Sequence, residues 1–174
     1  MMMSNKKTST PNANQRWYQK DKTLLSLVNK LQKMPTALME TYCKCIIDYA
    51  LELYKQDTNK RLFIEAGSEK HQGLIKSLDK KRWCDKNPYS YRAFNALYLM
   101  DELRRNDLAL RLIQSESLLH AYNQRCLQCD CSPNLDVVGH LLLVFVNQGE
   151  QEALSTLNLL EAQGQLGRLI NASN

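Results

Sequence analysis

The stretch from Pro35 to Gln56, PTALMETYCKCIIDYALELYKQ, decides the fold. Its polar residues recur at every fourth position: Thr36, Glu40, Lys44, Asp48 and Glu52. Because a helix has 3.6 residues per turn, this spacing places them in one narrow stripe, and the apolar and aromatic residues between them cover the remaining surface. The sequence therefore predicts a central helix over 35–56 that is buried around most of its circumference.

A single helical domain, residues 16–170, is expected to form around this central helix. Residues 1–15 are polar and show no hydrophobic periodicity, so we expect a disordered tail there. Of the 174 residues, 44% are apolar and 24% are charged, and the chain has only 6 Gly and 4 Pro. This composition is typical of one globular domain, and the scarcity of turn-forming residues favours long helices. The expected fold class is all-α, a bundle of six or seven helices in antiparallel hairpins.

Capping residues indicate where two of these helices begin. Asp21 or Thr23 can accept hydrogen bonds from the first backbone amides of a helix that precedes the central one. Asn87 followed by Pro88 is typical of a helix start, since proline at the first helical position gives up an amide that has no partner there.

Two hairpins are predicted in the second half of the chain. The first pairs a helix over 88–105 with a helix over 106–128. The second covers 133–163 and turns at Gly149. Its first arm contains the apolar, valine-rich run 137–146, where a helix is favoured and one buried strand is the alternative.

The start of the expected domain has a distinctive order of residues: Arg16-Trp17-Tyr18, Lys20-Asp21, Leu24 and Leu27-Val28. This order resembles the opening of small bacterial all-helical proteins that begin R-W-Y-D-x-D-P. Gln19 and Lys22 stand where that pattern has Asp and Pro. The resemblance covers residues 16–31 and implies a bacterial helical protein, and it transfers no activity or catalytic residue to this chain.

Three of the six cysteines lie close together: Cys126, Cys129 and Cys131. Thiolates are zinc ligands, and a C-x-x-C pair at a helix end can present two of them, with Cys84 or His120 as the candidate fourth ligand of a zinc or iron site. The usual second C-x-x-C pair is missing. Plain buried thiols are therefore favoured over a metal site, and over redox chemistry or a disulfide. No other cofactor is expected.

A basic stretch with one tryptophan is the second candidate site: Lys76, Lys80, Lys81, Arg82, Trp83 and Lys86. Lysine and arginine neutralise phosphates, and an aromatic ring can stack on an exposed base. The net charge of +5 is modest, and no nucleic-acid-reading motif is present. A solvated helix end explains the same residues, so nucleic-acid binding is the less favoured interpretation.

Binding or assembly is favoured over catalysis. The chain contains no P-loop, no G-x-S-x-G motif and no H-E-x-x-H motif. A surplus of large apolar residues on several predicted helices favours a protein partner or self-association, such as a homodimer. No secretory signal and no membrane segment are expected, since the most apolar run, 137–146, is short and contains His140. We therefore expect a cytoplasmic protein.

Overall fold

The computed structural model describes residues 16–65 and 83–169. The elements in chain order, with η for a 3-10 helix, are η1 (Trp17–Lys20), α1 (Lys22–Lys33), α2 (Thr36–Leu53), α3 (Thr58–Glu65), η2 (Trp83–Lys86), α5 (Pro88–Leu99), α6 (Glu102–Gln114), α7 (Glu116–Gln128), β1 (Cys131–Pro133), α8 (Leu135–Gln148), α9 (Glu150–Ala162) and β2 (Gly167–Leu169). The predicted all-α fold is confirmed. Among the described helices, none combines the length and the hydropathy needed to cross a lipid bilayer.

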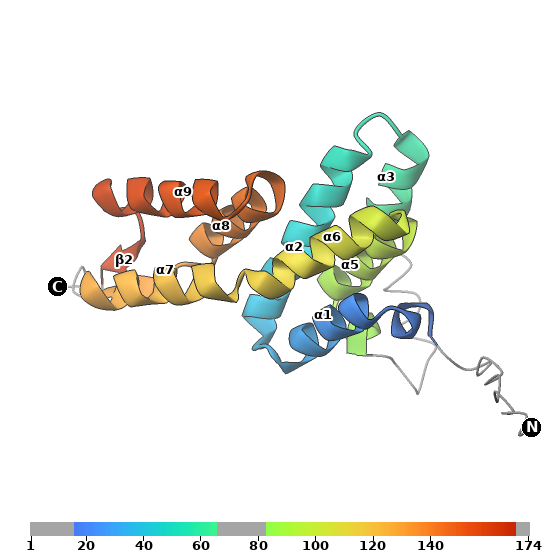
Figure 1. Ribbon diagram of the computed structural model, residues 1–174, viewed down its shortest axis with the longest axis horizontal. Helices are drawn as coiled ribbons and strands as arrows, with labels where there is room; N and C mark the ends of the chain where they lie inside the picture. Colours follow the sequence, from blue (N-terminus) through green and yellow to red (C-terminus); the bar gives the residue numbers. More distant parts are fainter. Residues whose placement is uncertain (1–15, 66–82, 170–174) are drawn as a thin grey trace, which may run out of the picture.

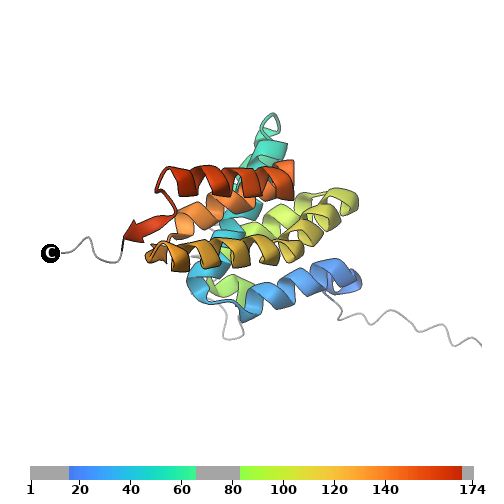
Figure 2. The same ribbon diagram turned by 60° about the vertical axis from the view of Figure 1, so that its left-hand side comes forward.

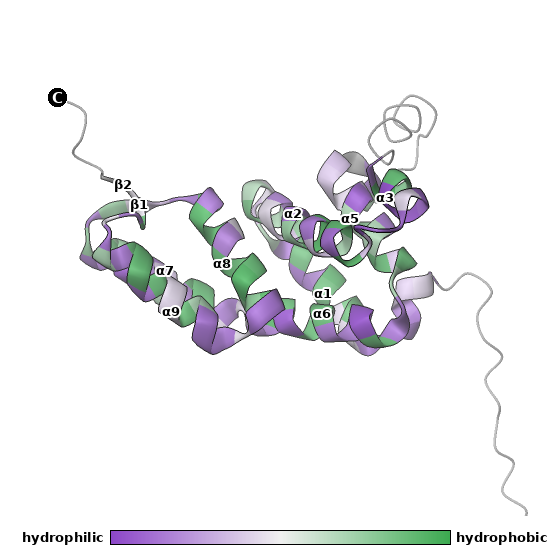
Figure 3. Ribbon diagram, turned by 90° about the horizontal axis from the view of Figure 1, so that it is seen from above, coloured by the Kyte–Doolittle hydropathy of each residue, from purple (hydrophilic) through white to green (hydrophobic). Residues whose placement is uncertain are grey.

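The central helix α2 is packed as the sequence predicts. It lies against α5 on one side and α8 on another, an arrangement visible from above in Figure 3. Its buried side chains are Met39, Thr41, Tyr42, Cys43, Cys45, Ile46, Ile47 and Ala50. Lys44, Asp48 and Glu52 are exposed, which confirms the polar stripe. The helix begins one residue after Pro35, which is its N-cap.

The apolar run 137–146 lies within α8, so the alternative of a buried strand is wrong. The Asn134 side chain accepts a hydrogen bond from the Asp136 backbone N–H (2.9 Å) and caps the start of α8. Gly149, with φ at 99°, ends the helix in a conformation that favours glycine. The helices α8 and α9 then pack along each other, as predicted for the second hairpin.

Residues 88–128 form three helices instead of the two that were predicted. The Asp101 side chain accepts a hydrogen bond from the Arg104 backbone N–H (3.0 Å), so a new helix, α6, begins there. The helices α6 and α7 continue almost end to end with a break at Ser115 (Figure 1). Since α6 packs mainly on α1, and α7 on α9 and β1, the helices α5 and α6 do not pack along each other as the predicted hairpin requires.

A short two-stranded ribbon connects the end of α7 to the C-terminal part of the described chain. The strands β1 and β2 are antiparallel, with Cys131 opposite Leu169. Gly167 approaches β1 so closely that a Cβ atom there would overlap the carbonyl oxygen of Ser132. Figure 2 shows β2 beside the ends of α7 and α9.

Asn87 caps α5, as predicted, and the cap can be tested by mutation. Its side-chain oxygen accepts hydrogen bonds from the backbone N–H groups of Tyr89 (2.8 Å) and Ser90 (3.3 Å), and its Nδ2 donates to Glu40 of α2. We expect Asn87→Ala to lower the free energy of unfolding by about 1–2 kcal/mol, measured by urea denaturation. The control, Asn59→Ala on the exposed surface of α3, should change it by less than about 0.5 kcal/mol. Equal effects at the two positions would contradict the capping role.

Candidate functional site

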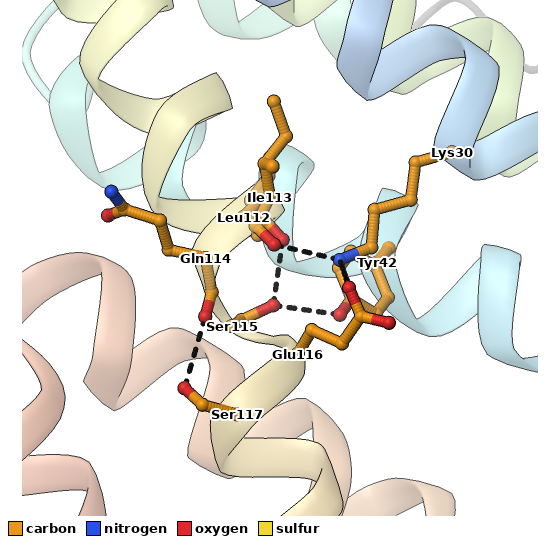
Figure 4. A network of polar contacts seen from close by, with 8 residues as sticks. All are labelled: Lys30, Tyr42, Leu112, Ile113, Gln114, Ser115, Glu116 and Ser117. Atoms are coloured by element: carbon orange, nitrogen blue, oxygen red, sulfur yellow. Dashed lines mark hydrogen bonds and ion pairs between the residues drawn. The ribbon is translucent and has the colours of Figure 1, made fainter.

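Side chains bind the carbonyl groups that become available where α6 ends and α7 begins. The last turn of a helix has carbonyl oxygens without intrahelical partners. Here the Ser115 hydroxyl donates to the Leu112 carbonyl (2.8 Å), and the Lys30 ammonium donates to the Ile113 carbonyl (2.9 Å). Figure 4 shows these bonds at the bend. Because Lys30 belongs to α1, the second bond attaches α1 to the end of α6.

Tyr42 of the central helix α2 reaches the same bend. Its Oη lies 2.8 Å from Ser115 Oγ, and both side chains are fully buried (Figure 4). Because the Ser115 hydroxyl donates to Leu112, the Tyr42 hydroxyl is the donor in its bond to Ser115. Burial raises the pKa of Tyr42 to about 12, so it remains a neutral hydrogen-bond donor at physiological pH.

Lys30 brings a positive charge to this partly buried place. Its Nζ lies 3.7 Å from a carboxylate oxygen of Glu116 and 5.9 Å from the centre of the Tyr42 ring. The Lys30 side chain is 20% exposed, whereas that of Glu116 is 85% exposed. Burial lowers the pKa of Lys30, and the Glu116 carboxylate acts in the opposite direction. The ammonium is therefore less well solvated than a surface lysine, and its counter-ion faces solvent.

A cleft of about 650 Å³ opens over Lys30, and its walls come from α1, α2, α7 and the corner between α1 and α2. We call it the Lys30 cleft. Its apolar wall consists of Met34, Pro35, Leu38 and Leu119. Polar side chains of α1 complete the lining: Ser26, Asn29 and Lys33. The volume is in the range of known ligand sites, about 300–1,000 Å³. An apolar wall next to two amines suits a ligand that joins an apolar part to an anionic one.

This cleft was not predicted from the sequence. Lys30 belongs to the first predicted helix, and Ser115 lies in the middle of a segment that was predicted to be one helix. One local feature could have indicated the site. Lys30 lies between the buried residues Val28 and Leu31, so its charge stands beside the apolar face of α1.

The cysteine cluster lies at the other end of α7. Cys129 and Cys131 form a disulfide, so the expectation of plain thiols is wrong for these two, while Cys126 is a buried free thiol. Cys84 lies on η2, which packs on α5, and His120 is an exposed residue of α7. Within residues 16–65 and 83–169, no three His, Cys, Asp or Glu side chains are grouped so that they could hold a metal. Binding of zinc or iron stays a prediction.

The structure describes only the end of the basic stretch. Four of its members lie outside the described residues: Lys76, Lys80, Lys81 and Arg82. The Lys86 side chain is not described either. The Trp83 ring packs edge-on against Phe94 of α5, with ring centres 5.5 Å apart. This contact holds η2 against α5. Nucleic-acid binding by the basic stretch stays a prediction.

Comparison with known proteins yields no family to which the chain can be assigned. No family model, no curated protein and no solved structure matches it. A function for the Lys30 cleft is therefore inferred from the shape and charge of the cleft itself.

Proposed function

We propose that this protein acts by binding a partner protein in the bacterial cytoplasm, and that the Lys30 cleft receives a segment of that partner. The segment carries a carboxylate side chain next to apolar side chains. The carboxylate would pair with Lys30, with Lys33 beside it, and the apolar side chains would lie against Met34, Leu38 and Leu119. Binding of this kind needs no catalytic group.

The observation that carries this proposal is the unequal exposure of Lys30 and Glu116. The lysine is mostly buried at the cleft, while its ion-pair partner is 85% exposed and 3.7 Å away. Because the separation is long and Glu116 is in solvent, we expect this ion pair to contribute little to stability, about 0–1 kcal/mol as for surface pairs. A carboxylate from a partner can therefore displace Glu116 at small cost and gain a charge-assisted hydrogen bond with a partly buried ammonium.

The electrostatics of Lys30 favour recognition over a purely structural role. Because its pKa is lower in the folded protein than in the unfolded chain, the folded state binds fewer protons in the pH range between the lowered pKa and the ordinary lysine pKa of 10.5. The charge of Lys30 therefore opposes folding at neutral pH, and this penalty disappears as pH rises towards 10.5. Groups whose pKa is perturbed in this way cluster at functional sites.

The proposal is tested by titrating the isotope-labelled full chain with three blocked tripeptides and following backbone amide signals by NMR. The peptides are acetyl-Leu-Glu-Leu-amide, acetyl-Leu-Gln-Leu-amide and acetyl-Leu-Lys-Leu-amide, which differ only in the charge of the central side chain. We expect the Glu peptide to bind tightest, with shifts confined to α1, the start of α2 and the start of α7. Equal binding of the three, or shifts elsewhere, would contradict the proposal.

The variant Lys30→Met is expected to weaken binding of the Glu peptide about tenfold, because it removes one charge-assisted hydrogen bond. Its free energy of unfolding should fall by about 1–3 kcal/mol, because the Ile113 carbonyl loses its donor while methionine fills similar space, so binding is compared on the folded variant. The control is Lys55→Met, which removes an exposed lysine after the other end of α2. It should leave binding unchanged.

The same variants separate a foreign partner from a second copy of the chain. If the segment comes from a second copy, sedimentation will show a dimer that dissociates in Lys30→Met and persists in Lys55→Met. A dimer that survives Lys30→Met would place self-association outside this cleft.

A further inference from the structure

The disulfide between Cys129 and Cys131 spans a turn of one residue. Cys129 is the C-cap of α7, where its N–H donates to the Arg125 carbonyl (3.0 Å), and Cys131 begins β1. Asp130, between them, has φ at 53°, in the left-handed region that Asp adopts more readily than most residues. This turn brings the two Cα atoms to 5.4 Å from each other, within the range that a disulfide bridges.

The two sulfur-bearing residues differ in their access to solvent. Cys131 is 6% exposed, whereas Cys129 is exposed at the end of α7. Thiol–disulfide exchange proceeds by attack of a thiolate on one sulfur, and access decides which sulfur is attacked. A thiolate from outside therefore reaches Cys129, and Cys131 is the leaving group.

This disulfide is poorly suited to stabilising the fold. It joins residues only two positions apart, and a crosslink that closes so small a loop restricts the unfolded chain less than one that closes a long loop. Three other described cysteines are buried thiols outside any disulfide: Cys43, Cys45 and Cys126. The chain thus differs from small secreted domains that are held together by several disulfides.

We propose that Cys129 and Cys131 form a thiol–disulfide exchange site that accepts two electrons from a partner dithiol, with Cys129 as the sulfur that is attacked. This site lies at the far end of α7 from the Lys30 cleft and does not depend on what that cleft binds.

The exchange reaction takes place in two steps. A thiolate of the partner attacks Cys129 Sγ and forms a mixed disulfide, while the bond to Cys131 breaks and its electron pair leaves on Cys131 Sγ, which takes a proton from solvent. The second thiol of the partner loses its proton and attacks the partner's own sulfur in the mixed disulfide. The partner leaves as a disulfide, and Cys129 leaves as a thiolate that takes up a proton. Two electrons and two protons pass from the partner to this chain.

The surrounding structure accommodates both redox states. In the reduced state the Cys129 thiol can donate to the Cys126 carbonyl oxygen, which lies 3.4 Å from Cys129 Sγ. Cys131 stays in β1, because β1 remains paired to β2 through backbone hydrogen bonds that do not involve sulfur. Reduction therefore removes the crosslink without requiring the ribbon to separate.

The first test uses the folded wild-type chain equilibrated in mixtures of reduced and oxidised dithiothreitol, followed by alkylation and mass spectrometry. Trypsin cuts after Arg125 and Arg168, so one peptide contains all three clustered cysteines. We expect two thiols, Cys129 and Cys131, to appear together in one two-electron transition while the protein remains folded. A disulfide that is reduced only after unfolding in urea, or a pair that includes Cys126, would overturn the proposal.

The second test compares two single variants in their reaction with Ellman's reagent, a small aromatic disulfide. Cys131→Ser leaves the exposed Cys129 and should react at least about tenfold faster than Cys129→Ser, in which Cys131 and the other described cysteines are all buried. The control Cys126→Ala should keep the wild-type transition. Equal rates in the two serine variants would overturn the assignment of Cys129 as the attacked sulfur. Bound zinc that keeps both thiols reduced in every dithiothreitol mixture would overturn the exchange site as a whole.

Discussion

The free energy of unfolding is expected to fall steeply as pH rises from about 9 to about 12, because four buried acidic groups keep their protons in the folded protein. Burial raises the pKa of the Cys43 and Cys45 thiols from 9.0 to about 12. It also raises the pKa of the Tyr42 and Tyr122 phenols from 10.0 to about 12. In the unfolded chain these groups lose their protons at the ordinary values.

Between these pH values the folded state therefore binds more protons than the unfolded state, so stability decreases with pH. Each group contributes up to about 1.4 kcal/mol per pH unit while it is charged only in the unfolded chain. Lys30 has the opposite effect, since its pKa is lowered on folding, but within residues 16–65 and 83–169 it is one group against these four. The sum is a decrease of several kcal/mol, enough to unfold a domain of ordinary stability.

The measurement is urea denaturation of the reduced protein at about pH 8, pH 9.5 and pH 10.5. The variant Cys45→Ala should be less stable than wild type at pH 8 but lose stability more slowly as pH rises, because one titrating thiol is gone. The exposed variant Lys55→Met serves as the control and should follow the wild-type curve. A profile that stays flat to pH 10.5 would show that the four groups are not buried as described.

The sequence predicts the central helix well because its pattern is a direct consequence of burial. A helix surrounded by neighbours can keep polar side chains only on the strip that faces solvent, and Lys44, Asp48 and Glu52 mark that strip. The start of α5 at Asn87 and the end of α8 at Gly149 were predictable for a different, local reason. In both places the chain needs a residue type with special backbone chemistry.

The break between α6 and α7 was not predictable in this way. Ser115 is neither glycine nor proline, and the backbone N–H of Ser115 still donates to the Arg111 carbonyl. What stabilises the break is tertiary: the hydroxyl of Tyr42 and the ammonium of Lys30 arrive from α2 and α1. Contacts between residues so far apart in the chain are absent from any local pattern, and the Lys30 cleft depends on them.

The cysteine pair illustrates how a turn changes the meaning of a spacing. Cys43 and Cys45 are also two positions apart, but within a helix two such side chains point about 200° apart and both stay free thiols. Cys129 and Cys131 have the same spacing, and the left-handed conformation of Asp130 brings them together. The predicted helix end at Gln128 is correct, but the sequence alone does not show the left-handed turn at Asp130, which decides between the two outcomes.

The second large effect is expected for Tyr122→Phe, which removes one oxygen atom from the protein. The Tyr122 hydroxyl donates to the Leu166 carbonyl (2.6 Å) and accepts from the Asn134 backbone N–H (2.7 Å). Phenylalanine leaves both backbone groups without this partner, and an unsatisfied buried polar group costs about 1–3 kcal/mol. We expect the free energy of unfolding to fall by about 2–4 kcal/mol.

The matched control is Tyr42→Phe, which removes the same atom from another fully buried tyrosine. There the Ser115 hydroxyl keeps its bond to the Leu112 carbonyl, so no backbone group loses its partner, and the expected loss is about 1 kcal/mol. Urea denaturation at neutral pH measures both values. Amide hydrogen exchange adds a local readout, because the Asn134 amide should exchange faster in Tyr122→Phe and unchanged in Tyr42→Phe. Equal losses in the two variants would mean that Tyr122 does not hold the β1–β2 ribbon against α7, since its effect would then be that of any buried phenol.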